Sequence, residues 1–184
     1  TYALERDFDV EVDWRPLTLD IPAYLGAAKV DKQGNVVAEN RNAHQWRRVR
    51  YSYMDCRRQA NELGLTIRGP RKIFDSSIAA VGMLFAQKQG VFSAYNDKTF
   101  ESFWKRELDI EDPAAVAGVL AEVGADASVF STYLEDEGKS ELDRLRLEAE
   151  ELGVFGVPTF VLDGELFWGR EHLPMIRRRL GKGD

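Results

Sequence analysis

The segment 154–169, VFGVPTFVLDGELFWG, constrains the fold of this chain more than any other. Two apolar runs flank the pair Asp163-Gly164. An Asp-Gly pair between such runs favours the type I′ turn of a β-hairpin, because that turn needs positive φ at both central residues. We therefore expect antiparallel strands over residues 159–162 and 165–168.

Pro158 stands where the first of these strands begins, a position at which it removes no ladder hydrogen bond. From local chemistry alone, the Val157–Pro158 peptide bond is expected to be trans, since only about 5–6% of X-Pro bonds in folded proteins are cis.

Residues 42–63 show the clearest helical pattern. Apolar side chains recur there at spacings of three and four, and Gly64 provides a stop. The stripe consists of Trp46, Val49, Tyr53, Cys56, Ala60 and Leu63. Because Cys56 falls on this apolar stripe, we expect a small buried side chain and not a reactive thiol, which needs exposure and a stabilised thiolate.

Several shorter elements surround this helix. Residues 10–19 are a candidate strand, whose regular pairing we expect to end near Pro16. Residues 31–35 are expected to form a turn at the tip of a small hairpin. Further helices are expected from a cap at Asp75 or Ser76 to about residue 90, over 98–108, from Asp112-Pro113 onward, over 126–134 and 140–152, and from near Glu171.

This order of elements predicts an α/β protein with strands near both ends and a helical block between them. We expect one domain from residues 1–25 and 150–184, a helical subdomain over 41–149, and a connecting loop or hairpin over 26–40. So few short strands need a covering layer and a further partner strand, which we expect upstream of Thr1.

Composition excludes several classes of function. The chain has 184 residues, 44% hydrophobic and 30% charged, as is ordinary for a soluble globular protein. A single cysteine excludes an internal disulfide or C-x-x-C pair, and with only two histidines a zinc site is not expected. The phosphate-binding motif G-x-x-x-x-G-K-[ST] and the dinucleotide-binding motif G-x-G-x-x-G are both absent from the sequence, so no nucleotide is expected. No apolar run reaches the ~20 residues that span a bilayer, and no signal peptide is visible, so we expect a cytoplasmic protein without a membrane partner.

The formal net charge of −6 hides a basic segment. Residues 41–72 carry nine Lys or Arg against two acidic residues, and a second basic run closes the chain at 177–179. Either these side chains coat solvated helix faces, or they attract an anionic small molecule. Nucleic acid is not expected as a partner, because the total charge is acidic and no recognition motif is present.

Three stretches together resemble a known family. They are GVFGVPTF at 153–160, Gly164-Glu165, and FWGREHL at 167–173; weaker matches lie at 48–60 and 74–80. This pattern resembles the DsbA-like branch of thioredoxin folds. Within that branch it is most similar to the group of 2-hydroxychromene-2-carboxylate isomerases and kappa-class glutathione transferases.

The resemblance implies a thioredoxin-like α/β fold with an inserted all-helical subdomain. It also implies a cis Val157–Pro158 bond, and a first strand and active-site helix start upstream of Thr1. The family's catalytic residue lies at that helix start, so none is expected within these residues. Ser76 stands where the group commonly has Asn, and Glu171-His172 where it has Asp-Arg.

The activity implied by the resemblance is that of an isomerase or transferase acting on small aromatic carboxylates. Its cofactor would be glutathione or another low-molecular-weight thiol, without metal, and the family leaves room for a homodimer. The expected thiol- and substrate-binding residues are Val157, Pro158, Arg170, Glu171, Ser76 and Ser77. Two alternatives stay open. One is a disulfide oxidoreductase with an upstream C-x-x-C, and the other is a non-catalytic binding module.

Overall fold

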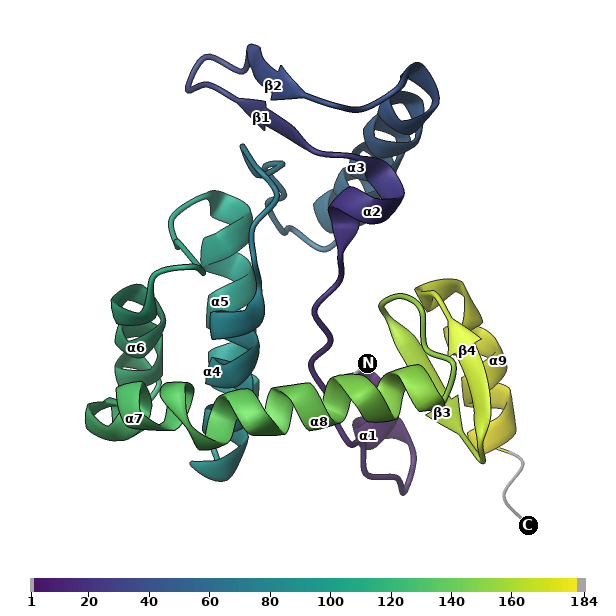
Figure 1. Cartoon of the computed structure of the whole chain (residues 1–184). Helices are drawn as coiled ribbons and strands as arrows, with labels where there is room; N and C mark the ends of the chain where they lie inside the picture. Colours follow the sequence, from purple (N-terminus) through teal and green to yellow (C-terminus); the bar gives the residue numbers. More distant parts are fainter. Residues whose placement is uncertain (1, 182–184) are drawn as a thin grey trace. The chain divides into compact units, whose positions relative to one another are not determined.

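The computed structural model of the chain describes residues 2–181 (Figure 1). The chain divides into two compact units. The terminal unit combines the residues up to Leu17 with those from Asp143 onward, and the middle unit comprises Thr18–Leu142.

Both units mix helices with a two-stranded antiparallel sheet. The strands are β1 (Ala28–Val30), β2 (Val36–Glu39), β3 (Thr159–Leu162) and β4 (Glu165–Trp168). The α-helices are α1 (Tyr2–Asp7), α2 (Ile21–Leu25), α3 (Ala43–Glu62), α4 (Ser77–Lys88), α5 (Phe92–Lys105), α6 (Pro113–Glu122), α7 (Phe130–Glu135), α8 (Glu137–Glu151) and α9 (Leu173–Leu180). Two short 3₁₀ helices are η1 (Ala127–Val129) and η2 (Arg170–His172). Among residues 2–181, no helix is both long enough and apolar enough to cross a membrane.

The predicted C-terminal hairpin is confirmed. Strands β3 and β4 pair in register from Thr159 opposite Trp168 to Leu162 opposite Glu165. Asp163 and Gly164 have φ of 53° and 78°, the positive values that the tight turn requires. Helix α9 lies beside this hairpin (Figure 1). A small core of Leu4, Phe167 and Ile176 joins α1, β4 and α9.

The predicted strand over 10–19 is wrong, because the structure has irregular extended chain there. Val10 and Val12 still pack against the core of the terminal unit. The Val12 amide donates to Oε1 of Glu5 at 3.1 Å and not to a neighbouring strand. The alternating pattern therefore marked a half-buried segment whose backbone has no ladder partner among residues 2–181.

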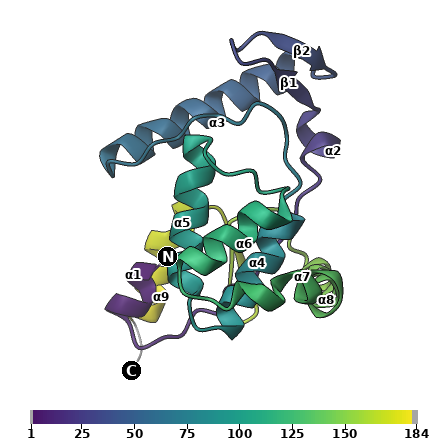
Figure 2. The same cartoon turned by 90° about the vertical axis from the view of Figure 1, so that its left-hand side faces the viewer.

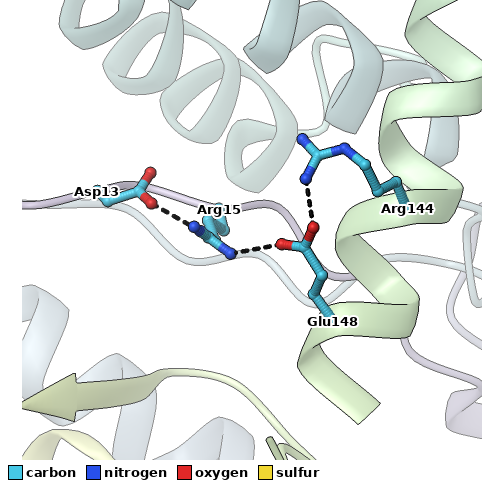
Figure 3. A network of polar contacts seen from close by, with 4 residues as sticks. All are labelled: Asp13, Arg15, Arg144 and Glu148. Carbon is cyan, nitrogen blue, oxygen red and sulfur yellow. Dashed lines mark hydrogen bonds and ion pairs between the residues drawn. The ribbon is translucent and has the colours of Figure 1, made fainter. Parts of the chain in front are cut away.

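Arg15 attaches this extended segment to α8. Its guanidinium donates to Asp13 at 2.7 Å and to Glu148 at 2.9 Å, and Arg144 also pairs with Glu148 (Figure 3). All four side chains are at least partly exposed, so the network positions the segment and contributes little stability.

The core of the middle unit lies where α4 packs against α5, α6 and α7 (Figure 2). The close approach of α4 and α5 requires glycine at position 82, because a Cβ there would overlap the side chain of Tyr95. The hydroxyl of Tyr95 donates to the Ala79 carbonyl at 2.9 Å. The main buried side chains are Val81, Leu84, Phe85, Tyr95, Val116, Leu120 and Phe130.

The long helix of the middle unit begins and ends as its sequence predicts. Asn42 and Gln45 form a reciprocal capping box at the start of α3, and Gly64 follows its end. The prediction for Cys56 is wrong, because this thiol is exposed. Only Val49 and Ala60 are buried on α3, so the apolar stripe is covered at some positions and open at Cys56.

The remaining helices differ from the predictions mainly at their ends. Helix α5 begins at Phe92, six residues earlier than expected, and α8 begins at Glu137, so the break before it is at Asp136. The predicted turn over 31–35 joins β1 to β2, which confirms a hairpin within 26–40.

Candidate functional site

The backbone corner at residues 156–158 presents an open donor and acceptor. The Val157–Pro158 peptide bond is cis. Val157 is 50% exposed. Among residues 2–181, neither the amide nor the carbonyl of Val157 makes a hydrogen bond within the chain. Both groups can therefore pair with an extended ligand, as an added strand would.

Contacts on both sides hold this corner in place. The Gly169 amide donates to the Pro158 carbonyl at 2.8 Å, which continues the hairpin ladder beyond the last strand pair. The Thr159 hydroxyl donates to the Gly156 carbonyl at 2.6 Å. The corner is thus anchored at the residues on either side of Val157, while Val157 itself faces outward.

Trp168 forms one wall of the corner. A Cβ on Gly156 would lie 2.7 Å from Nε1 of Trp168, so only glycine lets the indole approach this backbone. The Phe155 ring packs against the same indole, with centroids 5.0 Å apart. Phe155 is 62% exposed and Trp168 43% exposed, so they offer an apolar surface beside the open backbone groups.

Two opposite charges follow the corner in the chain. Arg170 and Glu171 open η2, directly after Gly169, and both are exposed. Glu171 folds back over Gly169, so that a Cβ on this glycine would overlap the carboxylate. Within residues 2–181, neither Arg170 nor Glu171 forms an ion pair. The chain thus places an unpaired guanidinium and a carboxylate one and two residues from Gly169.

His172 lies mainly inside this turn. Its ring is half-buried and packs near Phe167, with centroids 6.1 Å apart. Its Nδ1 atom is buried and has no hydrogen-bond partner among the described residues. This arrangement fits packing at the start of the last helix.

Ser76 and Ser77 begin α4 in the middle unit. The Asp75 carboxylate accepts hydrogen bonds from the Ser77 hydroxyl at 2.6 Å and the Ser77 amide at 2.9 Å. These two bonds hold the pKa of Asp75 below its ordinary value. The Ser77 hydroxyl is therefore occupied by the Asp75 carboxylate, whereas the Ser76 side chain makes no capping bond.

Ser76 also lines a cavity of about 650 Å³, a volume typical of small-molecule sites. The β1–β2 hairpin and the segment 18–22 form part of its wall, together with Ile73 and Phe74. Lys72 pairs there with Glu111, which also accepts from the Asp75 amide at 2.8 Å. The hydrogen bond from Lys72, followed by that from Asp75, lowers the pKa of Glu111.

The expected binding residues therefore fall into two groups. Val157, Pro158, Arg170 and Glu171 gather around one corner of the terminal unit, and Ser76 and Ser77 belong to the middle unit. Among residues 2–181, no cluster of His, Cys, Asp or Glu could hold a metal ion.

Sequence reasoning missed two features of these sites. The first is the indole of Trp168 at the corner, because its contact with the backbone of Gly156 crosses the turn and has no signal in the residue spacing. The second is the Lys72–Glu111 pair of the cavity, whose members are 39 residues apart and carry no local signal.

The fold and the open corner define the class of protein. The family model of DSBA-like thioredoxin domains matches residues 2–181. The chain belongs to this family, which confirms the resemblance and the thioredoxin-like fold drawn from its sequence.

The individual relatives share about a quarter of their residues with this chain. The chain is 26% identical to the 2-hydroxychromene-2-carboxylate isomerase of Sphingobium xenophagum over 178 residues, which cover 96% of this chain and 86% of the relative. It is 27% identical to the enzyme of the same name from Pseudomonas putida over 150 residues, which cover 81% and 72%. A solved structure of a 2-hydroxychromene-2-carboxylate isomerase matches 98% of this chain and 85% of its own, with a TM-score of 0.72 and 21% identity. At that identity the structural match supports the fold alone.

Proposed function

We propose that this protein is a thiol-dependent isomerase of small aromatic carboxylates. The observation that carries this proposal is the open amide and carbonyl of Val157, anchored on both sides and flanked by an aromatic wall. The names of the relatives support the reaction class, because they are isomerases of a chromene carboxylate.

The residues around Val157 fit a peptide-like thiol such as glutathione. An extended ligand would pair with the amide and carbonyl of Val157 in the manner of an added strand. One end of glutathione carries both an ammonium and a carboxylate, and Glu171 and Arg170 supply the complementary charges side by side. The thiol would supply a nucleophile that adds to an unsaturated substrate and then leaves, which permits isomerisation.

Within the chain, each group has a separable role. The main chain of Val157 fixes the direction of the thiol, and Arg170 with Glu171 fixes its charged end. Phe155 and Trp168 would cover an aromatic substrate, since flat rings pack well against exposed aromatic side chains. Ser76 would donate a hydrogen bond to a molecule in the cavity of the middle unit, while Ser77 holds Asp75.

The group that activates the thiol is proposed to lie upstream of Thr1. A hydroxyl there would lower the pKa of a bound thiol by donating a hydrogen bond to the thiolate. The residues encoded in the ~20–30 positions before Thr1, about a strand, a loop and a helical turn, test this assignment. A serine supports the isomerase, a C-x-x-C pair would indicate a disulfide oxidoreductase, and neither would leave a binding module.

Binding and turnover test the proposal directly. Glutathione affinity is measured by calorimetry for the chain and for Arg170→Gln and Glu171→Gln, with Arg178→Gln as the matched control on the exposed face of α9. We expect a five- to thirtyfold loss in the first two variants, as for a charge-assisted hydrogen bond of about 1–2 kcal/mol, and no change in the control. Consumption of 2-hydroxychromene-2-carboxylate with and without glutathione then tests the reaction. Equal rates in both conditions would contradict thiol dependence.

A further inference from the structure

Four arginines of the middle unit gather around one loop. They are Arg57 on α3, Arg68 and Arg71 in the segment that follows, and Arg106 at the end of α5, here called the arginine cluster. All four side chains are exposed. They come from three separate stretches of the chain, so the fold, and not a local charge run, brings them together.

The backbone of residues 67–69 organises the arginine cluster. Arg106 donates to the Gly69 carbonyl through Nε at 2.9 Å and through Nη2 at 2.5 Å. Arg57 donates to the Ile67 carbonyl at 3.1 Å, and its Nη2 lies 3.6 Å from the place of a Cβ on Gly69. Two guanidinium groups therefore converge on Gly69.

Further contacts position Arg57, Arg68 and Arg106 in the cluster. The Arg68 amide donates to the Trp104 carbonyl at 2.9 Å, which ties the loop to the end of α5. The Arg57 guanidinium lies over the Tyr53 ring at 5.7 Å, and this ring packs edge-on against Trp104. Arg106 lies at the C-cap of α5 with a left-handed backbone, φ of 64°. These contacts limit the freedom of side chains that would otherwise spread into solvent.

No carboxylate neutralises this charge within residues 2–181, where none of the four arginines forms an ion pair. Three acids of the same unit pair with other cations: Asp55 with Arg58, Glu101 with Lys105, and Glu111 with Lys72. Glu107, which follows Arg106 in the chain, forms no ion pair with the cluster within these residues. Burial first, and then the charges of Arg71, Arg68 and Arg57, lower the pKa of Arg106. The guanidinium groups are thus close enough to repel one another.

Each guanidinium also retains donors that the backbone does not use. A guanidinium has five N–H groups in a planar fork. Arg57 uses one of them and Arg106 two on carbonyls of the loop, and Arg68 uses one on the Lys105 carbonyl at 3.4 Å. Phosphate oxygens match this fork in pairs, and a doubly charged anion offsets more of the repulsion than a single carboxylate. We propose that the arginine cluster is a binding site for a doubly charged oxyanion, the phosphate group of a small phosphorylated molecule.

Inorganic phosphate is the probe, and thermal unfolding and amide chemical shifts are the readouts. Phosphate at 10 mM is expected to raise Tm by about 3 °C over sodium chloride of equal ionic strength, as for a Kd near 1 mM. It should shift the amide signals of Arg68, Gly69 and Arg71, while sodium acetate at the same ionic strength should do neither. This assay contains no thiol and no chromene, so its result is independent of the proposed isomerase activity.

Arg71→Gln tests the cluster most cleanly, because the side chain of Arg71 makes no hydrogen bond within residues 2–181. We expect at least a fivefold loss of phosphate affinity, together with a slightly higher Tm without phosphate, since one repelling charge is removed. Arg48→Gln, on the exposed face of α3, is the matched control and should retain wild-type affinity. Equal affinity in the two variants, or equal effects of phosphate and acetate on the unmodified chain, would overturn the proposal.

Discussion

At the scale of single residues, the candidate corner depends on a glycine at position 156. The sequence shows this residue as part of a Gly-Val-Pro run, but not that the Trp168 indole lies against it. Contacts between side chain and backbone across a turn have no signature in spacing, which is why the hairpin was predictable and its aromatic wall was not. Likewise, the exposure of Cys56 depends on what covers α3, and a helical stripe alone does not determine this.

Gly156→Ala tests the contact with Trp168. The added methyl group would meet Nε1 of the indole at 2.7 Å, so we expect destabilisation of about 1–3 kcal/mol from overpacking. Gly118→Ala in α6 is the matched control, because nothing lies within 4 Å of its Cβ position. That change should stabilise the protein by about 0.5–1 kcal/mol. Urea unfolding of both variants measures the two effects, and similar signs would contradict the contact.

Asp7 is a titration marker for the packing of α9. Hydrogen bonds from Arg6 and then Arg177 lower the pKa of Asp7 to about 2. Because the folded-state pKa is depressed, the stabilisation from this carboxylate is complete above its ordinary pKa of ~4 and is lost as the pH falls toward 2.

Arg177→Met should therefore raise the pKa of Asp7 toward the ordinary value, since one of its two donors is removed. The carboxyl carbon shift of Asp7, followed by NMR between pH 1.5 and 6, measures this change. Arg178→Met is the control and should leave the titration unchanged. A pKa that is the same in Arg177→Met and the unmodified chain would show that Arg177 does not reach Asp7.

At the scale of elements, features set by neighbouring residues could be predicted, whereas features that depend on distant residues could not. The stop of α3 at Gly64, the start of α6 at Asp112-Pro113 and the Asp163-Gly164 turn are each encoded in adjacent residues, and each occurs where predicted. The expected strand over 10–19 failed because a strand needs a neighbour, and apolar alternation reports only which side chains are covered. The cavity in the middle unit is lined by segments between residues 18 and 111, so no single stretch of the sequence predicts it.

Asn42→Ala tests the cap of α3. The change removes the side-chain acceptor for the Gln45 amide and leaves the Gln45 side chain without its reciprocal role. We expect a loss of about 1 kcal/mol in the free energy of unfolding. Asn61→Ala, near the exposed end of the same helix, should cost less than half as much. Equal losses would mean that the cap contributes nothing specific to the start of α3.

At the scale of the whole molecule, the chain leaves the terminal unit at Leu17 and returns to it at Asp143. The family and the thioredoxin-like fold could be predicted from short C-terminal motifs, and the family model matches residues 2–181. The division into two units and its boundaries depend on the packing of Leu4 against residues near the other end of the chain. Such long-range contacts are not visible in local sequence patterns.

Two core substitutions test the independence of the units. Leu4→Ala should cost about 2–5 kcal/mol and reduce hydrogen-exchange protection in β3, β4 and α9. Leu120→Ala, a fully buried change in α6, should instead reduce protection in α4, α5 and α6. Loss of protection throughout the chain in both variants would indicate a single cooperative unit.

The most direct test of the open corner is a titration of the ¹⁵N-labelled chain with glutathione. We predict saturable shifts of the Val157, Gly169 and Arg170 amide signals, because these groups would bind or border the extended thiol. S-methylglutathione should bind with similar affinity, since the backbone pairing does not need a free thiol. If glutathione left the Val157 signal unmoved while shifting others, or shifted none, the corner would not be the thiol site.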